Sequence, residues 1–222
     1  MDSAGGFFAS QQADDLYYGT EADNRATLDP PRIDRVRYSG PNGEMAQAYV
    51  RAAELLGDSS LLEFAAATLE RIVGETYDRG HGLAHWLDDI DGVRGLLADQ
   101  VPVSEALLDL FHATDRAVYL DLAQELMLYA MRTLLDDHSG RFVDPVVHAA
   151  DVGLLRQPIA PFDLNCRAAH VLARLSRQTD RTDFAERARG ALGSQTVRAR
   201  SQGVEAASYV LAMRDVEFPK SS

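Results

Sequence analysis

The chain repeats one unit three times, and Asp58, Asp115 and Asp180 mark the same point in each copy. Apolar residues stand four, eight and eleven positions after each aspartate, and five, eight and twelve positions before it. These spacings put each set of three on one face of a helix. The sequence therefore predicts three helical hairpins, each a helix, a short turn and a second helix packed back on the first. The flanking positions are Ala46, Val50, Ala53, Leu62, Ala66, Leu69, Val103, Leu107, Leu110, Tyr119, Ala123, Leu126, Ala168, Leu172, Leu175, Phe184, Ala188 and Ala191.

The turn inside each unit contains the marking aspartate. A carboxylate at the start of a helix accepts hydrogen bonds from the free N–H groups there. We therefore expect Asp58, Asp115 and Asp180 to cap the second helix of each hairpin. The marks are 57 and 65 residues apart, so the copies differ mainly in the length of the segments between hairpins.

The apolar periodicity predicts seven helices and little strand. We expect them over 44–56, 60–76, 101–113, 117–136, 164–178, 181–194 and 203–214, the last without a partner helix. The segments 77–99 and 137–162 between hairpins are much longer than ordinary connections, and long loops on one face of a helical stack often carry binding groups. The chain then divides into an N-terminal loop segment (1–43), a helical-hairpin domain (44–215) and a tail (216–222).

The two ends of this map are related. Residues 5–8 (Gly-Gly-Phe-Phe) are similar to residues 139–142 (Ser-Gly-Arg-Phe), which follow a predicted outer helix and open an inter-hairpin loop. We therefore expect the chain to begin where a repeat ends.

The charge balance excludes several classes of function. Acidic residues outnumber basic ones 34 to 22, for a formal charge of −12, so no basic stripe is available for nucleic acid or an anionic membrane surface. Lysine occurs only at Lys220, which excludes a pyridoxal Schiff base, a P-loop and a kinase-type nucleotide site. We predict no nucleic acid, no membrane and no cofactor.

Cysteine also occurs once, at Cys166 among apolar helix residues, where a small buried thiol is expected. A single cysteine forms no internal disulfide, redox pair or cysteine-based zinc cluster, and this usage is typical of a reducing compartment. The first residues lack the basic and apolar regions of a signal peptide, and no apolar run reaches the roughly 20 residues of a membrane span. We predict a cytoplasmic protein.

Four segments in order resemble one known family. Residues 5–14 are similar to Gly-Gly-Phe-Tyr-Ser-x-Gln-Asp-Ala-Asp, and 31–34 with 42–43 are similar to an aspartate-containing stretch that ends in Trp-Asn-Gly/Ala. Residues 95–100 are similar to Gly-x-Leu-x-Asp-Tyr, and 165–172 to Asn-x-x-Ala-Ala-x-x-Leu. Together, over roughly residues 1–215, the chain resembles the thioredoxin-domain-containing family that includes the spermatogenesis-associated proteins.

The resemblance implies an all-α fold of repeated helical hairpins that form a partial (α/α)6 toroid, similar to N-acylglucosamine 2-epimerases and six-hairpin glycosidases. The family's thioredoxin domain has no counterpart here. The chain departs from the family pattern at several positions. Gln12 replaces an Asp, Pro41 a Trp and Gln100 a Tyr, and Asp15-Leu16-Tyr17 stands in place of Ser-Glu-Gly.

Two sequence patterns resemble metal sites, but neither supplies a complete set of ligands. His81 and His85 have the i,i+4 spacing of zinc ligands, but the neighbouring glycines disfavour a helix and no third ligand is evident. The acidic stretch 88–92 would put Leu87 and Ala98 at the two outer positions of a calcium loop, where oxygen ligands are needed. We therefore predict no metal site.

Residues that could handle a sugar lie at predicted helix starts and in the inter-hairpin loops. The face of Trp86, the only tryptophan, can stack on a sugar ring, or it can plug the core beneath its loop. Carboxylates and imidazoles can act as acid and base. The catalytic candidates are Asp14, Asp99, His85 and His148, and the substrate-binding candidates are Trp86, Asn42, Asp144 and Asn165, with Asp15 beside Asp14.

Two functions remain open at this stage, and so does the question of whether the chain is an enzyme. Seven helices are about half of a closed ring of six hairpins, so two edges lack neighbours. Either self-association or a partner chain covers these edges, or the helices close into a smaller bundle, and we predict self-association. A non-catalytic scaffold that completes a toroid is favoured, because several family positions are altered. The alternative is a carbohydrate-active or carbohydrate-binding protein with a sugar ligand at the toroid mouth.

Overall fold

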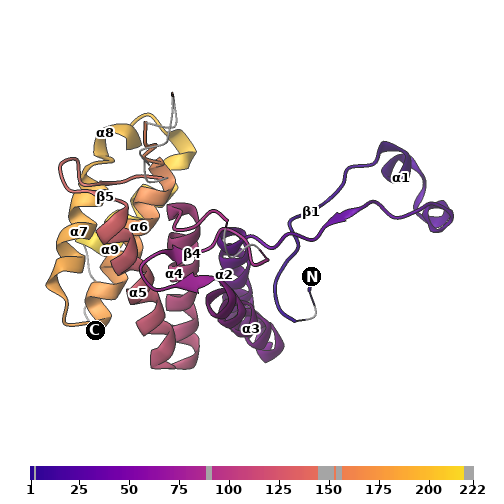
Figure 1. The fold of residues 1–222 in the computed structure, drawn as a ribbon, viewed down its shortest axis with the longest axis horizontal. Helices are drawn as coiled ribbons and strands as arrows, with labels where there is room; N and C mark the ends of the chain where they lie inside the picture. Colours follow the sequence, from indigo (N-terminus) through magenta and orange to yellow (C-terminus); the bar gives the residue numbers. More distant parts are fainter. Residues whose placement is uncertain (3, 89–91, 145–152, 154–156, 218–222) are drawn as a thin grey trace.

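The structure is a computed structural model that describes residues 1–2, 4–88, 92–144, 153 and 157–217. Figure 1 shows three helical hairpins in series, followed by a further helix. Their helices are α2 (Ser39–Leu56) with α3 (Ser59–Thr76), α4 (Leu97–Thr114) with α5 (Ala117–Thr133), α6 (Phe162–Gln178) with α7 (Thr182–Gly193), and then α8 (Thr196–Ala199) and α9 (Ala207–Glu217). All seven predicted helices are present.

The helices form two layers. The first helices of the hairpins pack side by side, with α4 between α2 and α6, and α9 continues the row against α6. We call α2, α4, α6 and α9 the inner helices. The second helices, α3, α5 and α7, are the outer helices, and each packs on its own partner. The core lies between the layers and along the inner row.

The repeating apolar positions form this core. Sixteen of the eighteen are buried, while Leu62 and Ala66 are half-buried. For Ala66 the reason is a one-residue shift in the first copy, because α3 and α5 begin at Ser59 and Ala117, which are 58 residues apart. In this register Ala65, which is fully buried, takes the place predicted for Ala66.

The same shift changes the caps. Asp58 caps α3, because its side chain accepts a hydrogen bond from the Ser60 N–H at 2.9 Å. The prediction is wrong for Asp115 and Asp180, since α5 and α7 have Arg116 and Arg181 at the capping position, without a side-chain hydrogen bond. Each of these two aspartates stands one residue too early in its turn to cap the following helix.

Short β-hairpins follow two outer helices at the same place in their repeats. Strand β3 (Tyr77–Asp78) pairs with β4 (Gly82–Leu83) after α3, and β5 (Leu135–Asp136) pairs with β6 (Arg141–Phe142) after α5. These turns bring the chain from each outer helix back to the start of the next inner helix.

The N-terminal segment forms an arm that stands off from the helices on the side of α2 and α3 (Figure 1). Strands β1 (Ser10–Gln11) and β2 (Ile33–Asp34) pair at its base, and it carries α1 (Asp15–Gly19) and a 3-10 turn (Ala22–Thr27). Neither of these two elements has a buried residue, so the arm has no core of its own.

In the part of the chain that the structure describes, no helix is both long enough and apolar enough to cross a bilayer.

Candidate functional site

A side-chain amide occupies the fourth position of α2, α4 and α6. In α6, Asn165 Oδ1 accepts the Phe142 N–H at 2.8 Å, and its Nδ2 donates to the carbonyls of Phe142 at 2.9 Å and Pro161 at 2.8 Å. The side chain therefore holds the end of β6 against the start of the helix.

The other two amides do the same. Asn42 accepts the Phe7 N–H at 2.6 Å and donates to the Phe7 carbonyl at 3.1 Å, and Gln100 accepts the Leu83 N–H at 3.2 Å. Phe7 and Phe142 are thus equivalent, one residue away from the pairing of Phe8 with Phe142 that the likeness of 5–8 to 139–142 predicted. Asn42 and Asn165, two of the substrate-binding candidates, are buried and bonded to backbone, so we do not include them among the sugar contacts proposed below.

A histidine–carboxylate pair lies where α2 and α4 begin. His85 Nδ1 is 2.9 Å from Asp99 Oδ2, and the Gly40 N–H of α2 donates to Asp99 Oδ1 at 2.9 Å. The Asp99 side chain is fully buried, whereas 28% of the His85 side chain is exposed. Burial raises the pKa of Asp99, and the hydrogen bond to Asp99 raises the pKa of His85 above its ordinary value. With Nδ1 held, Nε2 is the ring nitrogen available for proton transfer.

Asp144 reaches the same place from the loop after β6. Its two carboxylate oxygens accept the N–H groups of Leu97 at 3.1 Å and Ala98 at 3.2 Å, which are the free donors at the start of α4. Burial raises the pKa of Asp144, and its charge contributes to the raised pKa of His85. The structure thus brings together three of the predicted residues, His85, Asp99 and Asp144.

Aromatic rings border this group. The ring centre of Tyr38, directly before α2, is 5.0 Å from that of His85 and 6.2 Å from that of Trp86, to which it is perpendicular. Trp86 is half-buried, so it packs on its neighbours and also meets solvent. Tyr38 was not among the predicted site residues. Its place immediately before an inner helix is the sequence feature that indicates it. We call His85, Trp86, Asp99, Asp144 and Tyr38 the mouth cluster.

The remaining candidates lie elsewhere. Asp14 and Asp15 belong to the arm, where Asp14 caps α1 by accepting the Tyr17 N–H at 2.9 Å, and Figure 1 shows α1 well apart from the inner helices. His148 lies outside the described residues. His81 is exposed and pairs with Asp78 at 3.0 Å. Among the described residues, no three histidine, cysteine or acidic side chains are grouped to hold a metal ion.

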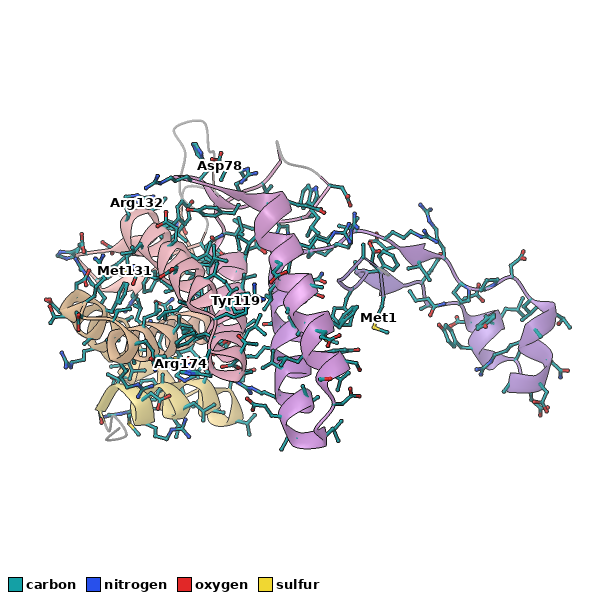
Figure 2. All side chains as sticks on the ribbon, turned by 90° about the horizontal axis from the view of Figure 1, so that it is seen from below. Met1, Asp78, Tyr119, Met131, Arg132 and Arg174 are labelled. Atoms are coloured by element: carbon teal, nitrogen blue, oxygen red, sulfur yellow. The ribbon has the colours of Figure 1, made fainter. Side chains whose placement is uncertain are left out.

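A second polar group lies farther along the inner helices. Glu105 is 2.8 Å from Arg167 and 3.2 Å from His170, and His170 Nε2 is 2.7 Å from Asp215 of α9. Burial alone would raise the pKa of Glu105, but its contacts with His170 and Arg167 together lower it. Arg174, labelled in Figure 2, continues this group toward Asp109 at 2.6 Å. Arg167 and Arg174 pair with carboxylates of α4 in this group. The group therefore stabilises the packing of the inner helices.

The fold of the chain is similar to that of solved sugar enzymes. The chain is similar to a family 76 α-mannanase from Bacteroides thetaiotaomicron at 18% identity and a TM-score of 0.67, over 88% of this chain and 55% of that one. It is similar to a sugar epimerase from a ruminal bacterium at 19% identity and a TM-score of 0.63, over 88% of this chain and 49% of that one. The fold is a partial (α/α)6 toroid.

A third similar structure is an inactive variant of the α-1,6-mannanase of Salegentibacter sp. HEL1_6 in complex with α-1,6-mannotriose, at 18% identity and a TM-score of 0.59, over 71% of this chain and 47% of that one. The chain spans about half the length of these toroids. No protein-family model and no curated protein sequence matches it.

Proposed function

We propose that this partial toroid binds a carbohydrate at the mouth cluster. The observation that carries the proposal is the His85–Asp99 pair beside the half-exposed ring of Trp86, at the start of the inner helices. Similar folds include a mannanase solved with a mannotriose and a sugar epimerase. An aromatic face next to hydrogen-bonding and charged groups is a common way to hold a sugar ring.

The chemistry proposed for the cluster is proton transfer by His85. Asp99 orients the imidazole through Nδ1, and its hydrogen bond raises the pKa of His85 above the ordinary value, which favours the protonated form that can donate a proton. The similar mannanase is inactive as a variant in which two adjacent aspartates are replaced. In this chain the adjacent pair Asp14-Asp15 lies in the arm, so the proposal rests on His85 rather than on paired aspartates.

The test is a titration with α-1,6-mannotriose, cellobiose and N-acetylglucosamine, followed by the fluorescence of Trp86 and by calorimetry. At least one sugar should change the emission, and His85→Gln should weaken its binding by about tenfold or more, which corresponds to loss of one good polar contact. His138→Gln, in the exposed turn between β5 and β6, is the matched control and should bind as the native chain does. If no sugar of the panel produces heat or a spectral change, the proposal fails.

A scaffold that completes a toroid with another chain remains a second candidate function, because apolar side chains of α2 are exposed at the edge of the partial ring. Membership of the thioredoxin-domain-containing family and the cytoplasmic location also remain proposals. They rest on the sequence motifs and on the amino-acid usage described above.

A further inference from the structure

The inner helices can be aligned residue by residue, because the amides Asn42, Gln100 and Asn165 occupy the same place in α2, α4 and α6. This alignment shows what each helix turns toward its neighbours. On α4, Val103 packs against α2, since a Cβ added to Gly43 would lie 2.9 Å from the Val103 nitrogen. Ala106 and Leu110 follow Val103 at helical spacing. We call these three α4 residues and their equivalents the leading face, which packs on the preceding inner helix.

The leading face is covered in α4 and α6 but not in α2. In α4 and α6 its three members are fully buried, namely Val103, Ala106 and Leu110, and Ala168, Val171 and Leu175. In α2 the equivalents are Met45, Ala48 and Ala52, followed one turn later by Leu55. Met45 is 41% exposed and Leu55 is 86% exposed. Helix α2 therefore carries an apolar leading face with no helix on it in the described chain.

Helix α9 has the complementary face free. On α2, the residues that receive α4 are Gly43, Ala46 and Val50, which we call a trailing face. At the same spacing, the segment leading into α9 and α9 itself carry Gly203, Ala206 and Val210, which are again glycine, alanine and valine. No atom lies within 4 Å of a Cβ placed on Gly203, and Val210 is 54% exposed.

The alignment of α9 is supported by its other side. Counted from Gly203, the leading face of α9 consists of Glu205, which is exposed, Ser208 and Ala212, and Asp215 follows one turn later. Ala212 is fully buried, and Asp215 bonds to His170 of α6 at 2.7 Å. Helix α9 thus uses its leading face on α6, as α4 does on α2, and keeps its trailing face exposed.

Charges at the two free faces are also complementary. Glu54 of α2 and His112 of α4 hold equivalent positions in this alignment, and the charge of Glu54 is close enough to contribute to the pKa of His112. In the same alignment, Arg214 of α9 is equivalent to Glu54 of α2. Glu54 of α2 is in turn equivalent to His112 of α4. Glu54 is exposed, and the Arg214 side chain is 57% exposed. A helix like α2 placed on α9 would therefore bring an arginine to a glutamate.

We propose that the trailing face of α9 is a docking site for α2 of a second copy of this chain, packed as α4 packs on α2 within one copy. The contact is head to tail, and it produces a ring if the rotation closes or an open chain if it does not. It covers the apolar stripe of α2 and pairs Arg214 with Glu54 of the second copy. The inference does not depend on the sugar site.

The test is the mass of the full chain in solution by light scattering over a wide range of concentration. The native chain should exceed 24.3 kDa as concentration rises. Ala48→Glu on α2 and Val210→Glu on α9 each place an unpaired charge in the contact, and each should weaken association by about 100-fold. Val118→Glu is the matched control on an exposed valine of α5 and should associate like the native chain.

Exchange of the charged pair tests the direction of the contact. Arg214→Glu and Glu54→Arg should each weaken association, and the double variant should restore it. All these positions are on exposed surfaces, and far-UV circular dichroism confirms that the variants are folded. A native mass of 24.3 kDa at every concentration would overturn the proposal. So would association that survives both Ala48→Glu and Val210→Glu, or stronger association of Glu54→Arg alone, which indicates that α2 packs on α2.

Discussion

Helices α2 and α4 have the same length and the same register but different surroundings. Each has 18 residues and a side-chain amide that holds the preceding loop, yet twelve residues of α4 are buried against seven of α2. Helix α4 has an inner helix on both sides, whereas α2 has one only on the side of α4. Equivalent residues are therefore core in one helix and surface in the other, so burial follows from the place in the ring as much as from the apolar pattern.

The largest effect expected from this difference is on stability. Leu110→Ala in α4 removes a fully buried side chain and should lower the free energy of unfolding by about 2–5 kcal/mol. The equivalent position in α2 already holds an alanine, Ala52, and Ala52→Leu should change the stability by less than about 0.5 kcal/mol. Urea unfolding of both variants in an Ala48→Glu background measures this difference in the monomer. Equal decreases in the free energy of unfolding for the two variants would show that the leading face of α2 is covered.

The helices themselves followed from the sequence, but their starts did not. Helices α2 and α4 begin at Ser39 and Leu97, ahead of the predicted starts at 44 and 101. In α2, Gly40, Pro41 and Gly43 have poor helix propensity, which placed its predicted start too late, and in α4 the prediction began directly before Pro102. Packing between the two helices overrides this preference. A Cβ on Gly40 would lie 2.3 Å from the Ala98 carbonyl, an oxygen to which Pro102 has no N–H to donate.

The candidate site was predictable in part for a related reason. His85, Trp86 and Asp99 were singled out because polar and aromatic residues stand in a long loop and at a helix start, and the fold does bring them together. The same signal selected Asn42 and Asn165, whose amides instead bind their own loop backbone. A polar residue at a helix start gives the same sequence pattern whether its side chain binds a ligand or holds the loop backbone. Likewise, no local pattern indicates where an arm points, so Asp14 was grouped with the mouth.

The next prediction concerns the carboxylates that serve the two helix starts. Asp99 binds both the start of α2 and His85, whereas Asp144 binds the start of α4 and acts on His85 only through its charge. Asp99→Asn should therefore lower the pKa of His85 more than Asp144→Asn does. An NMR titration of the His85 ring measures both shifts, and the opposite order would show that Asp144 is its main partner.

The sign of the pH dependence follows from the same pair. Asp99 raises the pKa of His85 in the folded chain above the ordinary value of 6.5. The stabilisation from protonated His85 is then fully present below its pKa in the unfolded chain and is lost as pH rises through its pKa in the folded chain. His85→Gln should remove this part of the decrease in stability above neutral pH, as measured by urea unfolding at a series of pH values.

The smallest expected effects lie in the turns of the same two hairpins, where the sequence suggested equal roles for two aspartates. Asp58 caps α3 through the Ser60 N–H, so Asp58→Ala should lower the melting temperature by about 2–4 °C.

Asp115 caps nothing in α5 and has a left-handed φ of 56°, in the place where the first hairpin has Gly57 with a φ of 68°. Because glycine adopts this conformation without steric cost, Asp115→Gly should raise the melting temperature by about 1–3 °C. Calorimetry of the two variants should therefore give shifts of opposite sign. Two decreases of similar size would mean that both aspartates are caps and that the first hairpin is not shifted by one residue relative to the second.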